Sequence, residues 1–314
     1  LDGDGYLASE EAVFESSDAD INHTISANIN VALNAYGLSD VSADVISNMM
    51  LWLDGKNIRA DSDYKNVINP TVSHDSPPID RWYDLTGNGN VARQYQSNYQ
   101  PTYNITSEYL SFDQDYMVSP LNINSELMPK MTIFAVYEFN EEGPIFGNDN
   151  SSVDFGRDRY VNEYQIGYGG ESETINRLES KKGNGRVFLF DLYLDSSGQS
   201  NSQILLDGGL TNTFTANDSD DGYNSLYIGS IFPVTSGYSD MITGNIAEII
   251  VVSGNVSESD RLIINEYLSV KWVIDMDIDM DGYTNNEETV FDSNPDDSTD
   301  VIQVDLSDVI DLYS

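Results

Sequence analysis

The stretch Ile246-Ala247-Glu248-Ile249-Ile250-Val251-Val252 indicates the fold class of this chain. It is the last long member of a series of short runs that are apolar or alternate between apolar and polar residues. Clusters of Gly, Asn, Asp and Ser separate these runs from one another, as turns separate strands. The earlier members of the series are Met49–Leu53, Met131–Tyr137, Arg186–Leu194 and Ser225–Gly229. Many strands with turn signals and few helices predict an all-β protein in which two antiparallel sheets form a sandwich.

Glu248 is the one charged residue within the apolar run Ile246–Val252. A carboxylate in the middle of a buried strand needs a partner, because an unpaired buried charge is costly. We expect Glu248 to pair with a basic residue such as Arg81 or Lys271 rather than to act as a catalytic acid.

A helix is expected to follow this strand, from Ser257 to Trp272. Ser257 can cap the amides that begin the helix, and Asp260 stands three residues later, where it can reach back. Apolar residues then recur at helical spacing. They are Leu262, Ile263, Tyr267 and Val270. The helix is predicted to pack on the end or flank of the sandwich.

An acidic motif occurs near both ends of the chain, since Asp4–Phe14 returns as Asp281–Phe291. The second copy fits the twelve-residue calcium loop at every ligand position, with Gly282 for the sharp turn. Its predicted ligands are Asp277, Asp279, Asp281, Tyr283, Asn285 and Glu288. The first copy keeps Asp2, Asp4, Tyr6 and Glu11 as predicted ligands. The alternative, a solvated acidic turn, leaves the spacing, the Gly and the terminal Glu unexplained.

The C-terminal motif resembles the thrombospondin type 3 repeats, a family of EF-hand-like calcium loops, through Asp281–Glu288 and the Asn294-Pro295-Asp296 that follows. The resemblance covers about 20 residues at each end and implies structural joints that bind Ca²⁺ in extracellular arrays. We therefore expect the chain to be one module of a longer, multidomain protein, with neighbouring modules of that same chain as partners.

Phrases between the two motifs resemble the concanavalin A-like, laminin-G-like jelly roll of bacterial surface proteins. They are Leu51–Gly55, Arg81–Ala92, Leu110–Asp113, Thr132–Val136, Leu226–Gly229 and Gly244–Val251, running on to Glu266–Trp272. The resemblance implies a jelly-roll sandwich and says little about the ligand. Trp52 and Trp82 are expected in the core, and Asp84 is expected to cap backbone amides in a tight Gly/Asn loop. A calcium role for Asp84 or Asn88 is the alternative.

Five segments follow from these assignments. Residues 1–20 are a partial calcium repeat, 21–47 a connector, 48–274 the jelly roll, 275–300 the second calcium repeat, and 301–314 a strand or the start of a further domain. Within the connector, Ile25–Leu33 alternates and predicts an edge strand, whereas Asp40–Met50 predicts a short helix.

Composition limits the partners and the surroundings. The chain has 314 residues, no cysteine and a formal charge of −39. Disulfides and zinc–thiolate sites are thereby excluded. Nucleic acid and anionic membranes are disfavoured as partners, since both require a basic face. No apolar run is long enough for membrane insertion. The two resemblances imply an extracellular, cell-surface or secreted bacterial protein.

Sequence patterns of enzymes are not found. The laminarinase family, whose jelly roll this chain resembles, carries its two catalytic carboxylates on one strand as Glu-x-Asp-x-x-Glu, a string that is missing here. Both histidines, His23 and His74, lie in polar surroundings, which disfavours a histidine-based triad. The prediction is a protein that is not an enzyme.

Binding is the remaining function. Four polar loops are candidates for ligand contacts: Gly147–Asp154, Gly167–Ser172, Ala216–Tyr223 and Pro233–Asp240. The candidate residues are Asp149, Tyr168, Asp218, Asp220 and Asp221. The hypothesis is a calcium-dependent, lectin-like adhesion module that recognises a glycan, a glycoprotein or a peptide. The alternatives are a structural spacer or filament subunit and an accessory domain of a carbohydrate-active enzyme.

Overall fold

The computed structural model describes most of the segment expected to form the sandwich and the helix after the second calcium loop. The described residues are 19, 27–56, 78–104, 106–139, 144–148, 160–162, 166–167, 187–196, 201–215, 223–230, 241–276, 283–295, 297, 299–300 and 302.

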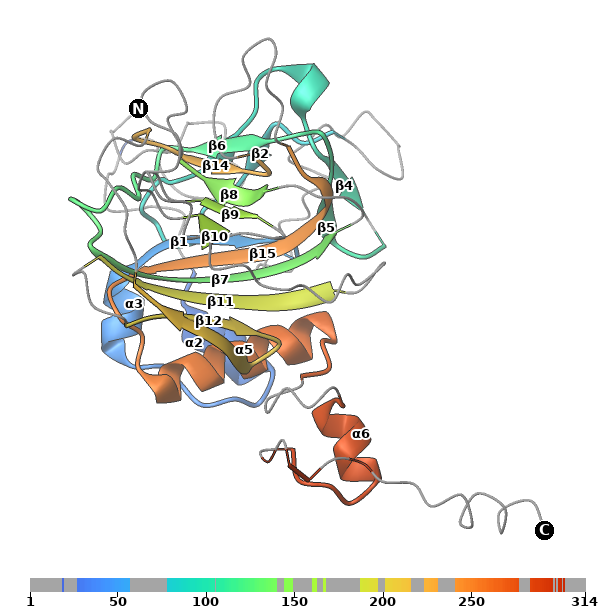
Figure 1. The fold of residues 1–314 in the computed structure, drawn as a ribbon. Coiled ribbons are helices and arrows are strands. Elements are labelled where there is room, and N and C mark those ends of the chain that lie inside the picture. Colours follow the sequence, from blue (N-terminus) through green and yellow to red (C-terminus); the bar gives the residue numbers. More distant parts are fainter. Residues whose placement is uncertain are drawn as a thin grey trace.

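Two antiparallel sheets form the body of the protein (Figure 1), which confirms the all-β sandwich. The first, sheet A, has the order β13-β12-β11-β7-β15-β5-β4 within the described residues, with β1 also paired to β15. Its strands are β1 (Met49–Asp54), β4 (Thr102–Asn104), β5 (Tyr109–Asp113), β7 (Lys130–Phe139), β11 (Val187–Asp195), β12 (Ser202–Leu206), β13 (Gly209–Phe214) and β15 (Thr243–Ser253).

Sheet B packs against sheet A and has the order β10-β9-β8-β14-β6-β3-β2 within the described residues. Its strands are β2 (Arg81–Trp82), β3 (Ala92–Arg93), β6 (Met117–Ser119), β8 (Pro144–Gly147), β9 (Tyr160–Asn162), β10 (Ile166–Gly167) and β14 (Leu226–Ile228). A short 3₁₀ helix, η1 (Ser97–Tyr99), precedes β4. Trp52 and Trp82 are fully buried, as predicted.

β15 is the centre of sheet A. β7 pairs along one edge of β15, while β5 and β1 share the other edge, at residues 243–246 and 248–252. Every residue from Gly244 to Val252 is buried. A strand covered on both faces is expected to be apolar throughout rather than alternating, which explains the run of isoleucine and valine.

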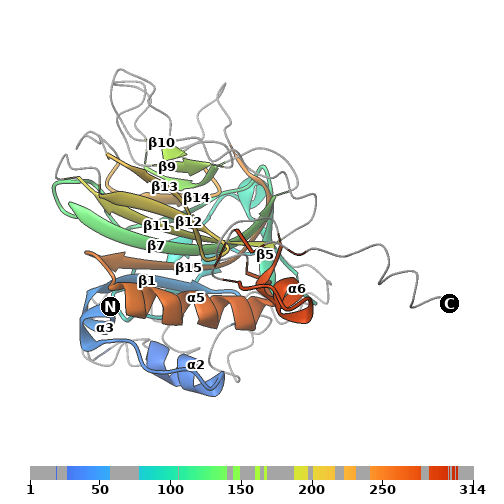
Figure 2. The same ribbon diagram turned by 60° about the horizontal axis from the view of Figure 1, so that its bottom comes forward.

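A helical layer covers the face of sheet A that points away from sheet B (Figure 2). It contains α2 (Ile29–Ala35), α3 (Ala43–Asn48) and α5 (Glu258–Trp272). A further helix, α6 (Asn285–Val290), follows beyond the end of α5. None of the described helices is both long and apolar enough to cross a membrane.

The edge strand predicted for Ile25–Leu33 is wrong, because α2 begins at Ile29. Asn28 caps this helix, since its Oδ1 accepts a hydrogen bond from the amide of Asn30 at 2.9 Å. Ile29, Ala32 and Leu33 are buried at helical spacing. The spacing of the apolar residues thus fits a helix as well as an alternating strand. The N-cap at Asn28 favours the helix. The short helix expected within Asp40–Met50 is confirmed as α3.

The N-terminus of α5 is confirmed, because Ser257 Oγ accepts a hydrogen bond from the amide of Asp260 at 3.2 Å. Its predicted apolar face is partly wrong. Leu262 and Val270 are about half exposed, at 54% and 51%, whereas Arg261 and Lys271 are buried. The reason is that carboxylates on sheet A pair with these two cations and turn that side of α5 toward the sheet.

Two buried cations of α5 form ion pairs with carboxylates of sheet A. Arg261 contacts both carboxylate oxygens of Asp191 on β11, at 2.9 and 2.8 Å. Lys271 Nζ lies 2.7 Å from Glu248 on β15 and 2.7 Å from Asp54 on β1. Lys271, one of the two basic residues expected to pair with Glu248, is therefore its partner.

Candidate ligand-binding face and calcium loop

The face of sheet B that points away from sheet A carries aromatic side chains. On β14, Leu226 and Ile228 belong to the main core, whereas Tyr227 belongs to a separate cluster with Tyr116 and Met241. Because side chains alternate along a strand, Tyr227 lies on the opposite face of the sheet from its two neighbours. This outer face is formed by strands that the helical layer does not cover (Figure 1).

Four tyrosines form a continuous series on this face, which we call the tyrosine row. Tyr99 and Tyr116 have ring centroids 5.6 Å apart, and Tyr116 and Tyr227 are 6.4 Å apart. Tyr223 then meets Tyr227 edge to face at 5.8 Å. These separations fall in the range of favourable aromatic pairs, so the rings support one another.

The phenol hydroxyls of the tyrosine row have no hydrogen-bond partner in the part of the chain that the structure describes. Burial raises the pKa of Tyr227 to about 12, with smaller contributions from Tyr223 and Tyr116. Tyr227 therefore keeps its proton at neutral pH and can donate a hydrogen bond. Tyr116 and Tyr227 are buried, at 6% and 8% exposed, so the half-buried Tyr99 and Tyr223 are the members of the row that offer ring surface to a ligand.

Amide side chains adjoin the Tyr223 end of the row, and we call them the asparagine corner: Asn122, Asn124, Asn148 and Asn224. Asn224 Oδ1 accepts hydrogen bonds from Asn122 and Asn124, at 2.9 and 3.1 Å. Among the described residues nothing accepts from the amide group of Asn224, which is exposed. The corner therefore places a fixed hydrogen-bond donor beside Tyr223.

The tyrosine row was not predicted from the sequence. Its one sequence signal is the alternation Leu226-Tyr227-Ile228, which places a tyrosine opposite two core residues. The predicted contact residues Asp149, Tyr168, Asp218, Asp220 and Asp221 lie outside the described residues. The predicted loop Ala216–Tyr223 does end at a member of the row.

The second calcium loop is described only in part. Asp277, Asp279 and Asp281 lie outside the described residues, as do Asp2, Asp4, Tyr6 and Glu11 of the first copy. Within the described part of the chain, no cluster of three or more acidic, histidine or cysteine side chains could hold a metal ion. Tyr283, Asn285 and Glu288 are described.

The two adjacent glutamates of α6 have different environments. Glu287 is exposed and completes a capping box with Thr284, which begins the helix. Glu288 is fully buried, and its Oε1 lies 3.3 Å from Ser293 Oγ. A carboxylate withdrawn from water in a six-residue helix suits a cation ligand better than a solvated turn. The described side of the loop is thus compatible with Ca²⁺.

Asp84 caps backbone amides, as predicted. Its oxygens accept hydrogen bonds from the amides of Trp52, Thr86 and Asn90, at 3.2, 3.0 and 2.9 Å. Burial raises the pKa of Asp84, and these hydrogen bonds oppose that shift. The carboxylate joins β1 to the turn after β2, which accounts for it without a calcium ion.

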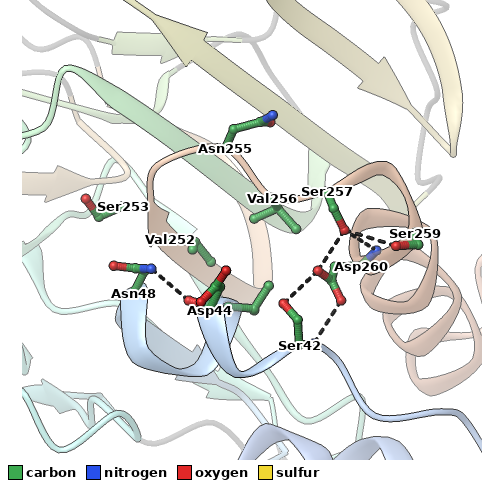
Figure 3. A pocket seen from close by; sticks show the side chains of 11 residues that line it. Ser42, Asp44, Asn48, Val252, Ser253, Asn255, Val256, Ser257, Ser259 and Asp260 are labelled. Carbon is green, nitrogen blue, oxygen red and sulfur yellow. Dashed lines mark hydrogen bonds between the residues drawn. The ribbon is translucent and has the colours of Figure 1, made fainter.

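A polar cavity of about 330 Å³ lies where α3 and the start of α5 meet the end of β15 (Figure 3). Asp260 is the buried carboxylate in its wall, and Ser42 donates to both of its oxygens, from the amide at 2.9 Å and from Oγ at 2.8 Å. Ser257 Oγ also donates a hydrogen bond to Asp260 Oδ2, at 2.7 Å. Burial raises the pKa of Asp260, but these contacts outweigh it and the net direction is downward. The cavity is a joint between α3 and α5.

No protein-family model and no curated protein matches this chain. Among solved structures, the Trypanosoma rangeli sialidase in complex with sialic acid is similar at 12% identity and a TM-score of 0.47, over 77% of this chain and 37% of the sialidase chain. The binding domain of botulinum neurotoxin serotype D is similar at 12% identity and a TM-score of 0.42, over 71% of this chain and 52% of that one. The chain thus spans about a third to a half of those chains. The likeness is loose, and the fold assignment rests on the two sheets themselves.

Proposed function

We propose that this chain is a non-catalytic carbohydrate-binding module and that the tyrosine row is its ligand-binding surface. The observation that carries the proposal is the combination, on one face, of aromatic rings, the asparagine corner and phenol hydroxyls that have no partner among the described residues. A sugar presents both apolar C–H faces and hydroxyl groups, so it matches rings and polar tips at once. Binding sites of this kind pair apolar walls with a few fixed polar groups.

The buried carboxylates support a binding function over catalysis. Asp54 and Glu248 are held by Lys271, and Asp191 is held by Arg261, all beneath α5. A glycosidase needs two carboxyl groups that face each other across a sugar. The three carboxylates named here serve the packing of the helix and are withdrawn from any sugar.

The proposal extends to an adhesion module of a bacterial extracellular, cell-surface or secreted protein in which Ca²⁺ stiffens the ends. Asp277, Asp279, Asp281, Tyr283, Asn285 and Glu288 would hold the C-terminal ion, and Asp2, Asp4, Tyr6 and Glu11 the N-terminal one. The ion would neutralise part of the acidic charge of −39. The extreme burial of Glu288 supports this extension.

Removing one ring or one hydroxyl from the row is expected to weaken glycan binding. Tyr223→Ala should lower affinity at least about tenfold, since aromatic anchors carry a large part of binding energy. Tyr227→Phe should lower it by about threefold to tenfold, the value of one neutral hydrogen bond. The measurement is a glycan array followed by calorimetric titration of the strongest ligand.

Tyr95→Ala is the matched control for the two tyrosine variants, because Tyr95 is 71% exposed and is not part of the row. It should bind the ligand as the unchanged protein does. A glycan array without any ligand would contradict the proposal, as would full binding by Tyr223→Ala.

Calcium is expected to raise the melting temperature and to bind with a dissociation constant of about 10⁻⁴ to 10⁻³ M, as in extracellular loops of this type. Ligands of the folded state stabilise it by mass action. Glu288→Gln should abolish the C-terminal binding step in calorimetry and reduce the thermal shift. Glu258→Gln, an exposed acidic residue in the first turn of α5, is the control. Equal melting curves in calcium and in chelator, with no heat of binding, would refute the calcium sites.

A further inference from the structure

A lysine and two carboxylates meet beneath the last turn of α5, withdrawn from water. Lys271 Nζ lies 2.7 Å from Asp54 Oδ1 and 2.7 Å from Glu248 Oε2. The side chain of Lys271 is 3% exposed, and those of Asp54 and Glu248 are 0% exposed. A nitrogen that close to a carboxylate oxygen lies about 3.5 Å from the carboxyl carbon, which is a near-attack separation for an amine and a carboxyl group.

Burial gives this site access to an uncharged state. Burial lowers the pKa of Lys271, but the charges of Asp54 and Glu248 outweigh it, so the ammonium form predominates. Keeping an ion pair away from water is costly, and a proton that moves from Nζ to Oδ1 of Asp54 leaves two neutral partners instead. This neutral pair is the minor state from which a slow reaction starts, because a desolvated lysine amine is a nucleophile.

The hydrogen bonds around the two carboxylates give them different roles. Glu248 accepts from the indole groups of Trp52 and Trp272, at 2.8 and 2.7 Å, and these donors favour its charged form, which can take up a proton. Asp54 Oδ1 accepts from the backbone amide of Lys56 at 2.9 Å. A backbone donor at this oxygen stabilises the negative charge that develops when a nucleophile adds to the carboxyl carbon. Asp54 is therefore suited to be the electrophile, and Glu248 the base.

We propose that the side chains of Lys271 and Asp54 condense into an amide bond, with Glu248 as the catalytic proton carrier. Nζ attacks Cγ of the protonated Asp54 carboxyl group with its electron pair. Glu248 takes a proton from the nitrogen and passes it to the departing hydroxyl, which leaves as water. One C–N bond forms and one C–O bond breaks, and the reaction uses no oxidant or other co-reactant.

The bond joins β1 to the end of α5. The covalent loop that it closes, from residue 54 to residue 271, contains every other described strand of both sheets. The chain has no cysteine, so no disulfide can supply such a link. A cross-link restricts the unfolded chain, and its effect grows with the length of the loop. Loss of Lys271 therefore removes an ion pair and, where the bond has formed, a cross-link as well.

Mass spectrometry of the unchanged, denatured protein tests the proposal. The intact mass is expected to be lower than the mass of the sequence by one water molecule. Trypsin does not cleave after a lysine whose amine is acylated, so residues 262–314 should stay whole and be joined to residues 1–56. A bond to Glu248 would instead join residues 262–314 to residues 187–261, and it would show that the assignment of Asp54 as the electrophile is wrong.

Three variants and a matched control locate the chemistry. Lys271→Arg and Asp54→Ala should restore the full mass and give separate peptides. Glu248→Gln should slow bond formation at least about a hundredfold, which is the usual contribution of a proton-transferring group. Lys130→Gln is the control, because Lys130 lies 3.2 Å from Asp195 but is 49% exposed, and this variant should keep the bond.

The unchanged protein alone can overturn the proposal, whether or not the variants fold. A full mass after prolonged incubation would do so. Loss of water without joined peptides would do so too, since an Asp–Gly sequence such as Asp54-Gly55 can lose water by forming a succinimide. Neither result bears on carbohydrate binding, which is measured separately with the tyrosine variants.

Discussion

Lys271→Met is expected to lower the free energy of unfolding by about 3–5 kcal/mol, which is the usual cost of removing one partner from a buried ion pair. Asp54 and Glu248 lie directly opposite each other on β1 and β15, and both are fully buried. Without the ammonium group, two carboxylates would face each other away from water. Chemical denaturation followed by tryptophan fluorescence measures the loss.

The protonation of this site follows from its geometry. Burial raises the pKa of Glu248, although Lys271 opposes the shift. Burial lowers the pKa of Lys271, but the charges of Asp54 and Glu248 outweigh that effect and the net direction is upward. Lys271 therefore stays protonated in the folded protein until the proposed bond to Asp54 forms. The indole groups of Trp52 and Trp272 donate to Glu248 at 2.8 and 2.7 Å and complete its hydrogen bonding.

Two comparisons isolate the charge from the packing of the Lys271 side chain. Lys130→Met removes a half-exposed cation that lies 3.2 Å from Asp195, and it should cost much less. Adding Asp54→Asn and Glu248→Gln to Lys271→Met should recover part of the lost stability, because the repelling charges are then gone. Equal losses for Lys271→Met and Lys130→Met would contradict this role of the buried ammonium group.

Gly55→Ala is expected to cost about 3 kcal/mol or more, or to prevent folding, because a β-carbon at this position has no room. It would lie 2.3 Å from the carbonyl oxygen of Glu108 and 2.8 Å from that of Ala247. Both are backbone atoms, so no side chain can move aside. Gly55 also receives a hydrogen bond from Tyr103 and donates one to Ala247.

Gly37→Ala is the control for this substitution. Nothing lies within 4 Å of a β-carbon at Gly37, and the expected cost of about 1–2 kcal/mol comes from its φ of 77° alone. Urea denaturation of both variants gives the comparison. A Gly55→Ala variant as stable as Gly37→Ala would show that the end of β1 can shift away from β15.

The sandwich itself was predictable because its information is local. Apolar runs between turn signals predicted the strands, and burial of Trp52 and Trp82 was expected from the jelly-roll phrases in which they stand. Asp84 was predictable as a cap because an aspartate before a tight Gly/Asn loop commonly accepts hydrogen bonds from the backbone amides of that loop. The cap at Ser257 is likewise a short-range signal.

The errors arose where the outcome depends on distant residues. The buried face of α5 is set by Asp191 and Glu248 on the sheet, so no period within the helix could show that Arg261 and Lys271 face inward. The apolar spacing of α2 fits both a helix and a strand, and the N-cap is the feature that favours the helix. The tyrosine row joins residues from three separate segments of the chain, at Tyr99, at Tyr116 and at Tyr223–Tyr227, and only the folded structure brings them together.

β15 has a consequence for the order in which this protein folds. Trp52 and its hydrogen-bonding partner Glu248 are 196 positions apart in the chain. The strands β1, β5 and β7 all pair with β15, which comes much later in the sequence. Such high contact order predicts slow folding. On a ribosome, β1 and β7 would emerge long before β15 and would have unpaired edges in the meantime, so the nascent chain is exposed to association until β15 is made.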